Sequence, residues 1–282
     1  MRRFCRFVFV FSILWPCGAG SVQAQWLPLN PVLSLQRESD GVQLALQNGA
    51  LKLQVCSDSI VRVRYSPTGA FPSRQEFLVI KDTWPATKWE MQSTDDTIVL
   101  STSQLKVVVT RKDSSVIFQD SAGKALFGQN EVSMTPTIVN GEQTYHAELR
   151  SKLWGSYESF YGLGQHQAGV WNYRGEAVDL SQDNTNISIP MLLSSNGYGI
   201  FWNNSSRSRF NNRFLNALYL SSEVAEVLDY YFIYGPEFDK VIAGYRELTG
   251  APPLFGKWAY GFWQCKNKYN TCLLYTSPSP RD

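Results

Sequence analysis

Histidine, a frequent general base, is scarce in this sequence, and the other residues that could do chemistry show no known catalytic spacing. His146 and His166 are its only histidines. A nucleophilic serine would need a Gly-x-Ser-x-Gly turn or an equivalent, and none occurs. Gly162 and Gly164 lie in a glycine-rich segment, but no Gly-Lys-Ser/Thr follows to hold a phosphate. The residues themselves therefore predict neither a nucleophilic triad nor a phosphate-binding loop.

The cysteines do not suggest metal or redox chemistry. Cys5 and Cys17 lie in an N-terminal leader, and Cys56, Cys265 and Cys272 remain, without the spacing of a zinc site. Their odd number gives no disulfide framework, although an oxidising compartment would allow one. We expect no metal and no cofactor, and we expect Cys56 to be buried in a strand.

A polar stretch between residues 203 and 213 is a further candidate for binding. It interleaves arginines with asparagines: Arg207, Arg209 and Arg213 with Asn203, Asn204, Asn211 and Asn212. One interpretation is contact with a sugar chain or a neighbouring domain; the other is a solvated loop.

Short strands must position these side chains, because apolar and polar residues alternate along much of the chain. The pattern is clear over residues 42–46, 51–55 and 61–65, with Asn48-Gly49 as a tight-turn signal between the first two. Further strands are expected at residues 98–101, 105–110, 116–119, 198–202 and 227–234, with a hairpin turn at 113–115. The sequence predicts a mainly β fold of the sandwich type.

Only one helix is clear, over residues 236–248, with Pro236 in its first turn and Gly250 as its stop. Its predicted apolar face holds Phe238, Val241, Ile242, Tyr245 and Leu248. The Ala-Pro-Pro of residues 251–253 reads as a linker. Residues 257–264 (Lys-Trp-Ala-Tyr-Gly-Phe-Trp-Gln) then predict a buried strand that opens a second domain.

Composition and the N-terminus indicate an exported globular protein. Of the 282 residues, 44% are hydrophobic and 18% charged, which favours a packed core over disorder. Arg2, Arg3 and Arg6 precede an apolar run at residues 7–15 that is too short to span a bilayer, and Val22-Gln23-Ala24 resembles a cleavage site. Residues 1–24 are predicted to be a signal peptide for the periplasm or the exterior. The leader holds three arginines and no acid, so its removal changes the net charge from +2 to −1 and leaves no basic cluster for nucleic acid.

The last segment, residues 272–282, does not fit the pattern before it. Two Ser-Pro pairs follow Cys-Leu-Leu-Tyr-Thr, where a helix would be expected after a barrel strand. We interpret the segment as a non-native tail resembling translated sequencing adapter, with a natural disordered tail as the alternative. The predicted organisation is a signal peptide (1–24), a β-sandwich (25–250), a linker with a first barrel strand (251–271) and the tail (272–282).

Three segments together resemble glycoside hydrolase family 31. They are residues 161–165 (Tyr-Gly-Leu-Gly-Gln), residues 184–204 (Asn-Thr-Asn through Ser-Ser-Asn-Gly-Tyr-Gly-Ile-Phe-Trp-Asn-Asn) and residues 252–264 (Pro-Pro through Lys-Trp-Ala-Tyr-Gly-Phe-Trp-Gln). The resemblance covers roughly residues 25–269. Phe262-Trp263-Gln264, followed by Lys266 and Tyr269, looks most like the α-xylosidase branch of the family.

The resemblance implies an N-terminal galactose-mutarotase-like β-sandwich followed by the first strand of a (β/α)8 barrel. It implies a retaining α-glycosidase, of the α-xylosidase or α-glucosidase type, that acts on an oligosaccharide. Such chemistry needs two carboxyl groups about 5–5.5 Å apart. In the family both are aspartates on later barrel strands, so the resemblance implies that this sequence ends before its catalytic residues and is inactive alone. We assign no catalytic residue.

The resemblance also implies that a sandwich loop reaches over the barrel mouth and helps to form the sugar subsite. The matching loop is residues 180–189, with Asp183 and Asn184 as candidates to hold two adjacent sugar hydroxyls; the alternative is an ordinary Asp-Asn turn. Trp263 and Gln264 would lie at the C-terminal end of the first barrel strand, where barrel active sites lie. Trp263 would supply a stacking face or pack in the barrel core.

Two other functions stay open at this point. One is a non-catalytic carbohydrate-binding β-sandwich. The other is an aldose epimerase, since epimerases of similar shape use a pair of histidines with a glutamate, although no glutamate here lies in a matching motif. The predicted strand at residues 257–264 favours the glycosidase. The sequence does not indicate an oligomeric state.

Overall fold

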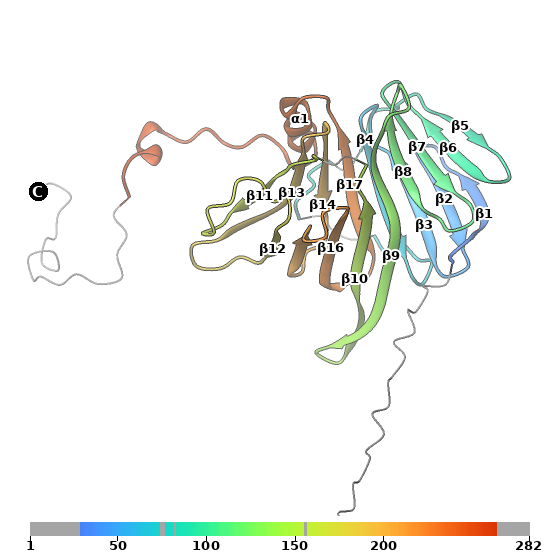
Figure 1. The fold of residues 1–282 in the computed structure, drawn as a ribbon, viewed down its shortest axis with the longest axis horizontal. Coiled ribbons are helices and arrows are strands. Elements are labelled where there is room, and N and C mark those ends of the chain that lie inside the picture. Colours follow the sequence, from blue (N-terminus) through green and yellow to red (C-terminus); the bar gives the residue numbers. More distant parts are fainter. Residues whose placement is uncertain (1–28, 74–76, 82, 155–156, 264–282) are drawn as a thin grey trace, which may run out of the picture.

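Two antiparallel β-sheets face each other in the computed structural model of the chain (Figure 1), which describes residues 29–73, 77–81, 83–154 and 157–263. The predicted signal peptide, Gln264 and the predicted tail lie outside the described residues. The predicted β-sandwich is therefore confirmed.

The first sheet has eight strands and ends at β1 on one side and at β11 on the other. In spatial order it contains β1 (Val32–Arg37), β2 (Gly41–Leu46), β3 (Ala50–Val55), β4 (Ile60–Ser66), β17 (Leu228–Tyr234), β14 (Tyr198–Trp202), β13 (Ile187–Ser194) and β11 (Phe160–Gln165).

The second sheet has nine strands and ends at β12 and β5. In spatial order it contains β12 (Ala177–Leu180), β15 (Ser208–Asn211), β16 (Ala217–Ala225), β10 (Glu142–Lys152), β9 (Ala125–Val139), β8 (Val116–Asp120), β7 (Leu105–Thr110), β6 (Thr97–Ser101) and β5 (Glu90–Ser93).

The core lies between the two sheets, because alternate residues of each strand point inward. Val42, Leu44 and Leu46 of β2 are buried there, and Phe118 of β8 stacks on Phe232 of β17 with ring centroids 4.0 Å apart. This stacked pair joins the two sheets at the centre of the sandwich. The alternation that predicts the strands thus corresponds to one face of each strand in this core.

The helix α1 (Phe238–Thr249) covers the outer face of the first sheet. Val241 and Leu248 are buried against Phe201 of β14 and Ile233 of β17, so these strands are covered on both faces. That double burial explains the continuous apolar run of β17.

The predicted helix is confirmed over most of its length, with two differences in detail. Pro236 precedes the N-cap residue Glu237 instead of lying in the first turn, while Gly250 with φ 87° ends the helix as predicted. Phe238 and Ile242 are partly exposed, so the buried face is narrower than the sequence predicts.

The predicted buried strand at residues 257–264 is wrong for the residues that the structure describes. Lys257–Tyr260 forms a short 3-10 helix, and Trp258, Phe262 and Trp263 are exposed. A strand needs a neighbouring strand to satisfy its backbone, and neither described sheet includes this segment. Hydrogen bonds within the segment take the place of those a strand would make with its neighbour: Ala259 N donates to Gly256 O, and Gly261 N donates to Trp258 O.

The polar stretch at residues 203–213 also differs from the solvated-loop interpretation. Its centre is β15, in which Ser208 and Phe210 are buried and Arg209 is exposed. Arg209 makes an ion pair of 3.3 Å with Asp179 on β12, the strand beside it. Arg209 therefore pairs with a residue of the neighbouring edge strand of the same sheet.

Candidate functional site

The glycine-rich segment Tyr-Gly-Leu-Gly-Gln (residues 161–165) lies inside β11. Gly162, Leu163 and Gly164 all have positive φ, of 93°, 63° and 94°. The register with β13 shifts between Gly162 and Gly164, which marks a β-bulge. A side chain is excluded at Gly164, because its Cβ would lie 1.9 Å from Ile187 O. Runs of strained backbone of this kind cluster near functional sites.

The bulge lies just before the first of three connected loops. These loops lie at the end of the sandwich opposite β1 and β5 (Figure 1). We call these loops, residues 166–175, 181–186 and 212–215, the loop surface. Gln167 N donates to Asn186 Oδ1 at 3.2 Å, and Gly175 N donates to Asn212 Oδ1 at 3.0 Å. These bonds join the first loop to each of the other two.

His166 fixes the start of the first loop. Its Nε2 lies 2.8 Å from Leu163 O, and its ring meets the edge of Tyr173 at 6.4 Å between centroids. These contacts give the histidine a positioning role. His146 lies on β10 of the other sheet, opposite Thr135.

Asp183 and Asn184 lie at the tip of the second loop, in a tight turn between β12 and β13. Asn186 N donates to Asp183 O at 3.2 Å, and Thr185 has a φ of 74°. Asp183 Oδ1 accepts a bond of 2.7 Å from Asn184 N. The predicted alternative, an Asp-Asn turn, is therefore present, and one oxygen of the carboxylate serves it.

The other polar atoms of this turn face solvent. Among the described residues, neither Asp183 Oδ2 nor the side-chain amide of Asn184 has a hydrogen-bond partner, and both residues are exposed. A carboxylate oxygen accepts hydrogen bonds, and an amide both donates and accepts them. The turn can therefore offer complementary groups to adjacent hydroxyls of a sugar ring.

Exposed aromatic residues of the loop surface are functional candidates that were not predicted from the sequence. Trp171 is 87% exposed in the first loop, and Phe214 is 64% exposed in the third. Each exposed ring adds apolar area to the loop surface, which also carries the polar turn, and this combination is typical of ligand and domain interfaces. A tryptophan between Gly169 and Gly175, in a segment without strand alternation, is the signal that was available.

Trp263 and Gln264 are not placed beside Asp183 and Asn184 by the described residues. Trp263 Nε1 donates to Ala259 O at 3.0 Å, and its ring lies 5.8 Å from that of Trp258. Gln264 lies outside the described residues. Of the three predicted binding residues that the structure describes, it brings together Asp183 and Asn184.

Glu158 carries a buried carboxyl group and is linked to the loop surface through Arg174. It is 1% exposed, and its Oε1 accepts bonds from the hydroxyls of Ser194 and Tyr198. Burial raises the pKa of Glu158 above its ordinary value, against the lowering effects of these two bonds and of Arg174. Arg174 of the first loop donates to Glu158 O at 2.9 Å, which ties that loop to the sheet.

No group of three or more His, Cys, Asp or Glu side chains in the described ranges is arranged to hold a metal ion. Within the same ranges, no helix has the length and apolar character needed to cross a membrane.

The fold and the loop surface together define a galactose-mutarotase-like β-sandwich. Residues 50–211 match the family model described as the glycosyl hydrolase 31 N-terminal galactose mutarotase-like domain, which is more than half of the chain. The chain therefore belongs to glycoside hydrolase family 31.

Curated relatives support this membership. The chain is 34% identical over 239 residues to an α-xylosidase of Saccharolobus solfataricus, covering 81% of this chain and 32% of that protein. It is 29% identical to an isomaltosyltransferase of Sporosarcina globispora, covering 87% of this chain and 24% of that protein. The chain thus spans a third or less of the length of these relatives.

Solved structures share the fold. A family 31 α-xylosidase of Xanthomonas citri superposes with a TM-score of 0.76 at 19% identity, covering 84% of this chain and 42% of that one. A family 31 dextranase of Flavobacterium johnsoniae, solved with isomaltotriose, gives a TM-score of 0.70 at 26% identity over 83% of this chain and 30% of that one.

Proposed function

We propose that this chain is the N-terminal part of an exported, retaining α-glycosidase that cleaves α-xylosides or α-glucosides in oligosaccharides. The observation that carries the proposal is the 34% identity to an α-xylosidase across 81% of the chain. The two catalytic carboxyl groups would be supplied by a barrel outside this sequence, because the chain spans about a third of that relative.

The role of the sandwich in this proposal is to hold part of the sugar subsite. Asp183 Oδ2 and the Asn184 amide would bond to sugar hydroxyls, while Trp171 would offer a flat apolar face to a sugar ring. The bulge at Gly162–Gly164 and the bonds around Glu158 would keep the loop surface in place before the sugar binds.

Export is part of the proposal and rests on the N-terminal residues alone. Three arginines precede the apolar run, and Ala24 ends a small-residue cleavage site. N-terminal sequencing of the secreted product tests it. We expect the mature protein to begin at Gln25, and retention of Met1 in an intracellular product would contradict export.

The test of the proposed subsite uses the longer protein encoded by the source DNA. Asp183→Ala removes an acceptor for sugar hydroxyls, and we expect kcat/KM on p-nitrophenyl α-xyloside or α-glucoside to fall about tenfold or more. Asp95→Ala is the matched control, since Asp95 is also an exposed aspartate in a tight turn, between β5 and β6.

Two results would count against the proposal in different ways. Equal kcat/KM for both variants would remove Asp183 from the subsite. Absence of hydrolysis of either substrate by the longer protein would contradict the glycosidase itself and favour a carbohydrate-binding module.

A further inference from the structure

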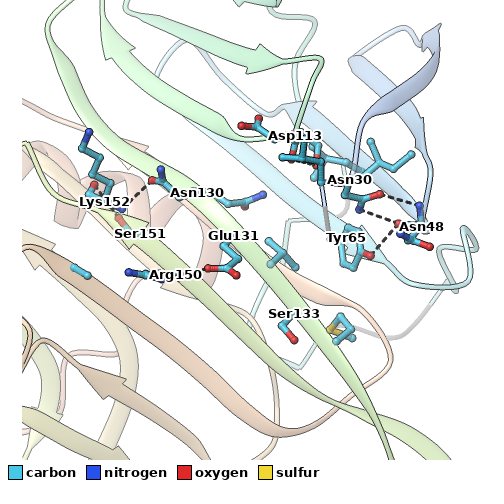
Figure 2. A pocket seen from close by; sticks show the side chains of 18 of the residues that line it. Asn30, Asn48, Tyr65, Asp113, Asn130, Glu131, Ser133, Arg150, Ser151 and Lys152 are labelled. Atoms are coloured by element: carbon cyan, nitrogen blue, oxygen red, sulfur yellow. Dashed lines mark hydrogen bonds and ion pairs between the residues drawn. The ribbon is translucent and has the colours of Figure 1, made fainter. Parts of the chain in front are cut away.

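A polar cavity lies away from the loop surface, in a cleft between the two sheets. Its volume is about 650 Å³, and it is lined by Leu46, Leu51 and Tyr65 of the first sheet and by residues of β9 and β10 in the second. Figure 2 shows Asn48 and Tyr65 on one side, with Glu131 and Arg150 across from them. The volume is within the roughly 300–1,000 Å³ range of ligand pockets. We call it the inter-sheet cleft.

A buried amide lines this cleft with half of its hydrogen-bonding capacity unused. Gln129 is 3% exposed, and its Oε1 accepts a bond of 2.8 Å from the buried hydroxyl of Tyr230. Among the described residues its NH₂ group has no partner. This NH₂ group is not among the fully enclosed side-chain atoms of the described residues that lack a partner, so it is open to the cleft and can donate to a ligand there.

A β-bulge shapes the same wall. Arg150 pairs with Glu131 and Ser151 with Gln129, so Asn130 is an extra residue in β9. Asn130 Oδ1 accepts a bond of 3.0 Å from Lys152 N, which leaves its NH₂ group without a partner in the described ranges. Bulges redirect side chains and are frequent beside binding sites. The wall thus presents two neighbouring amide donors.

The charges of the cleft balance, which indicates an uncharged ligand. Its two acids, Asp113 and Glu131, match its two bases, Arg150 and Lys152. Glu131 and Arg150 also pair with each other at 3.5 Å. An excess of bases would favour an anionic ligand, and the cleft has none. A cleft with amide donors, carboxylate acceptors and no net charge suits a molecule whose hydroxyls both donate and accept.

We propose that the inter-sheet cleft is a second carbohydrate site, which binds a neutral oligosaccharide independently of the loop surface. The choice of a sugar as the hydroxyl-rich ligand rests on the proposed function; the position and neutrality of the site rest on the cleft. No residue of the loop surface lines it.

Isothermal titration of the full chain with neutral xyloglucan heptasaccharide and with maltoheptaose tests this site. We expect at least one of these sugars to bind at a site that Asp183→Ala does not remove, and we expect no binding of tetragalacturonic acid, which serves as an acidic oligosaccharide for comparison. Ser133→Trp fills the cleft from β9 and is expected to weaken binding about tenfold or more. Asn48→Ala removes one lining amide from a turn, without changing a strand, and should also weaken binding.

Two control variants separate this site from other parts of the molecule. Thr135→Trp places the same bulky residue farther along β9, on an exposed position that does not line the cleft, and should leave the Kd unchanged. Asp183→Ala should also leave it unchanged. If neither neutral sugar binds, if only the acidic oligosaccharide binds, or if Ser133→Trp binds normally, the proposal is overturned. Binding lost only in Asp183→Ala would assign the sugar to the loop surface, overturning the second site while leaving the proposed glycosidase intact.

Discussion

Replacing Gly164 by alanine tests whether the bulge in β11 is what requires a glycine. Two costs add at this position. A non-glycine residue at a φ of 94° costs about 1–2 kcal/mol in backbone strain. The new Cβ would also lie 1.9 Å from Ile187 O, a backbone atom of β13 that cannot turn away.

The free-energy cost of the clash depends on how far the two strands must separate. To remove the contact between the new Cβ and Ile187 O, β11 and β13 must separate near the pair Gly164↔Ser188, which costs about 1–3 kcal/mol, as in an overpacked core. We therefore expect the free energy of unfolding to fall by about 3 kcal/mol, measured by urea denaturation followed by circular dichroism. Because β11 leads into the first loop, protease cleavage between residues 166 and 175 should also become faster.

Gly123→Ala provides the matched control for the backbone strain. Gly123, in the turn between β8 and β9, has a φ of 90°, nearly that of Gly164, but nothing lies within 4 Å of the position that a Cβ would take there. It should lose only the strain, about 1 kcal/mol. If both variants lose the same free energy to within about 0.5 kcal/mol, the close approach of β13 contributes nothing and the reasoning fails.

Two further predictions concern buried groups. Burial raises the pKa of Glu158 in the folded protein above its ordinary value of 4.5. The stabilising contribution of the protonated group to the free energy of unfolding is therefore complete below pH 4.5 and is lost as the pH rises through the folded pKa. Glu158→Gln should therefore become progressively more stable relative to the unmodified protein between pH 4 and pH 8; an unchanged difference in urea denaturation would contradict the assignment. Burial raises the pKa of Cys56 to about 12, so about one thiol in ten thousand is ionised at pH 8. In a chain whose other cysteines are serine, Cys56 should react with a thiol reagent only after unfolding, and rapid reaction in the folded protein would show that the site is open.

The strands that the sequence predicts are those whose buried face is continuous. β2, β3 and β4 alternate cleanly because one face packs in the core and the other is less buried. β9 and β10 were not predicted, because they extend past the core. Ile138 of β9 is 75% exposed, and this part of β9 is held by its pairing with β10. Because the outer part of this hairpin is held by backbone pairing and not by a buried face, no apolar–polar alternation marks it in the sequence.

The candidate site was predictable only where a short segment carries its own signal. Asp183 and Asn184 form one turn, and a motif of five residues marks the bulge before the first loop. Glu158 is different, since its partners Ser194 and Tyr198 lie 36 and 40 residues away. The inter-sheet cleft likewise joins Asn48 to residues of β9 and β10, which meet only in the folded sandwich.

The measurement that tests the central claim most directly is the anomeric configuration of the first product released by the longer protein. Hydrolysis of an α-xyloside or α-glucoside would be followed by proton NMR from the start of the reaction. A retaining α-glycosidase must release the α-anomer first, with the β-anomer appearing later by mutarotation. Initial release of the β-anomer, or no hydrolysis of either substrate, would contradict the account.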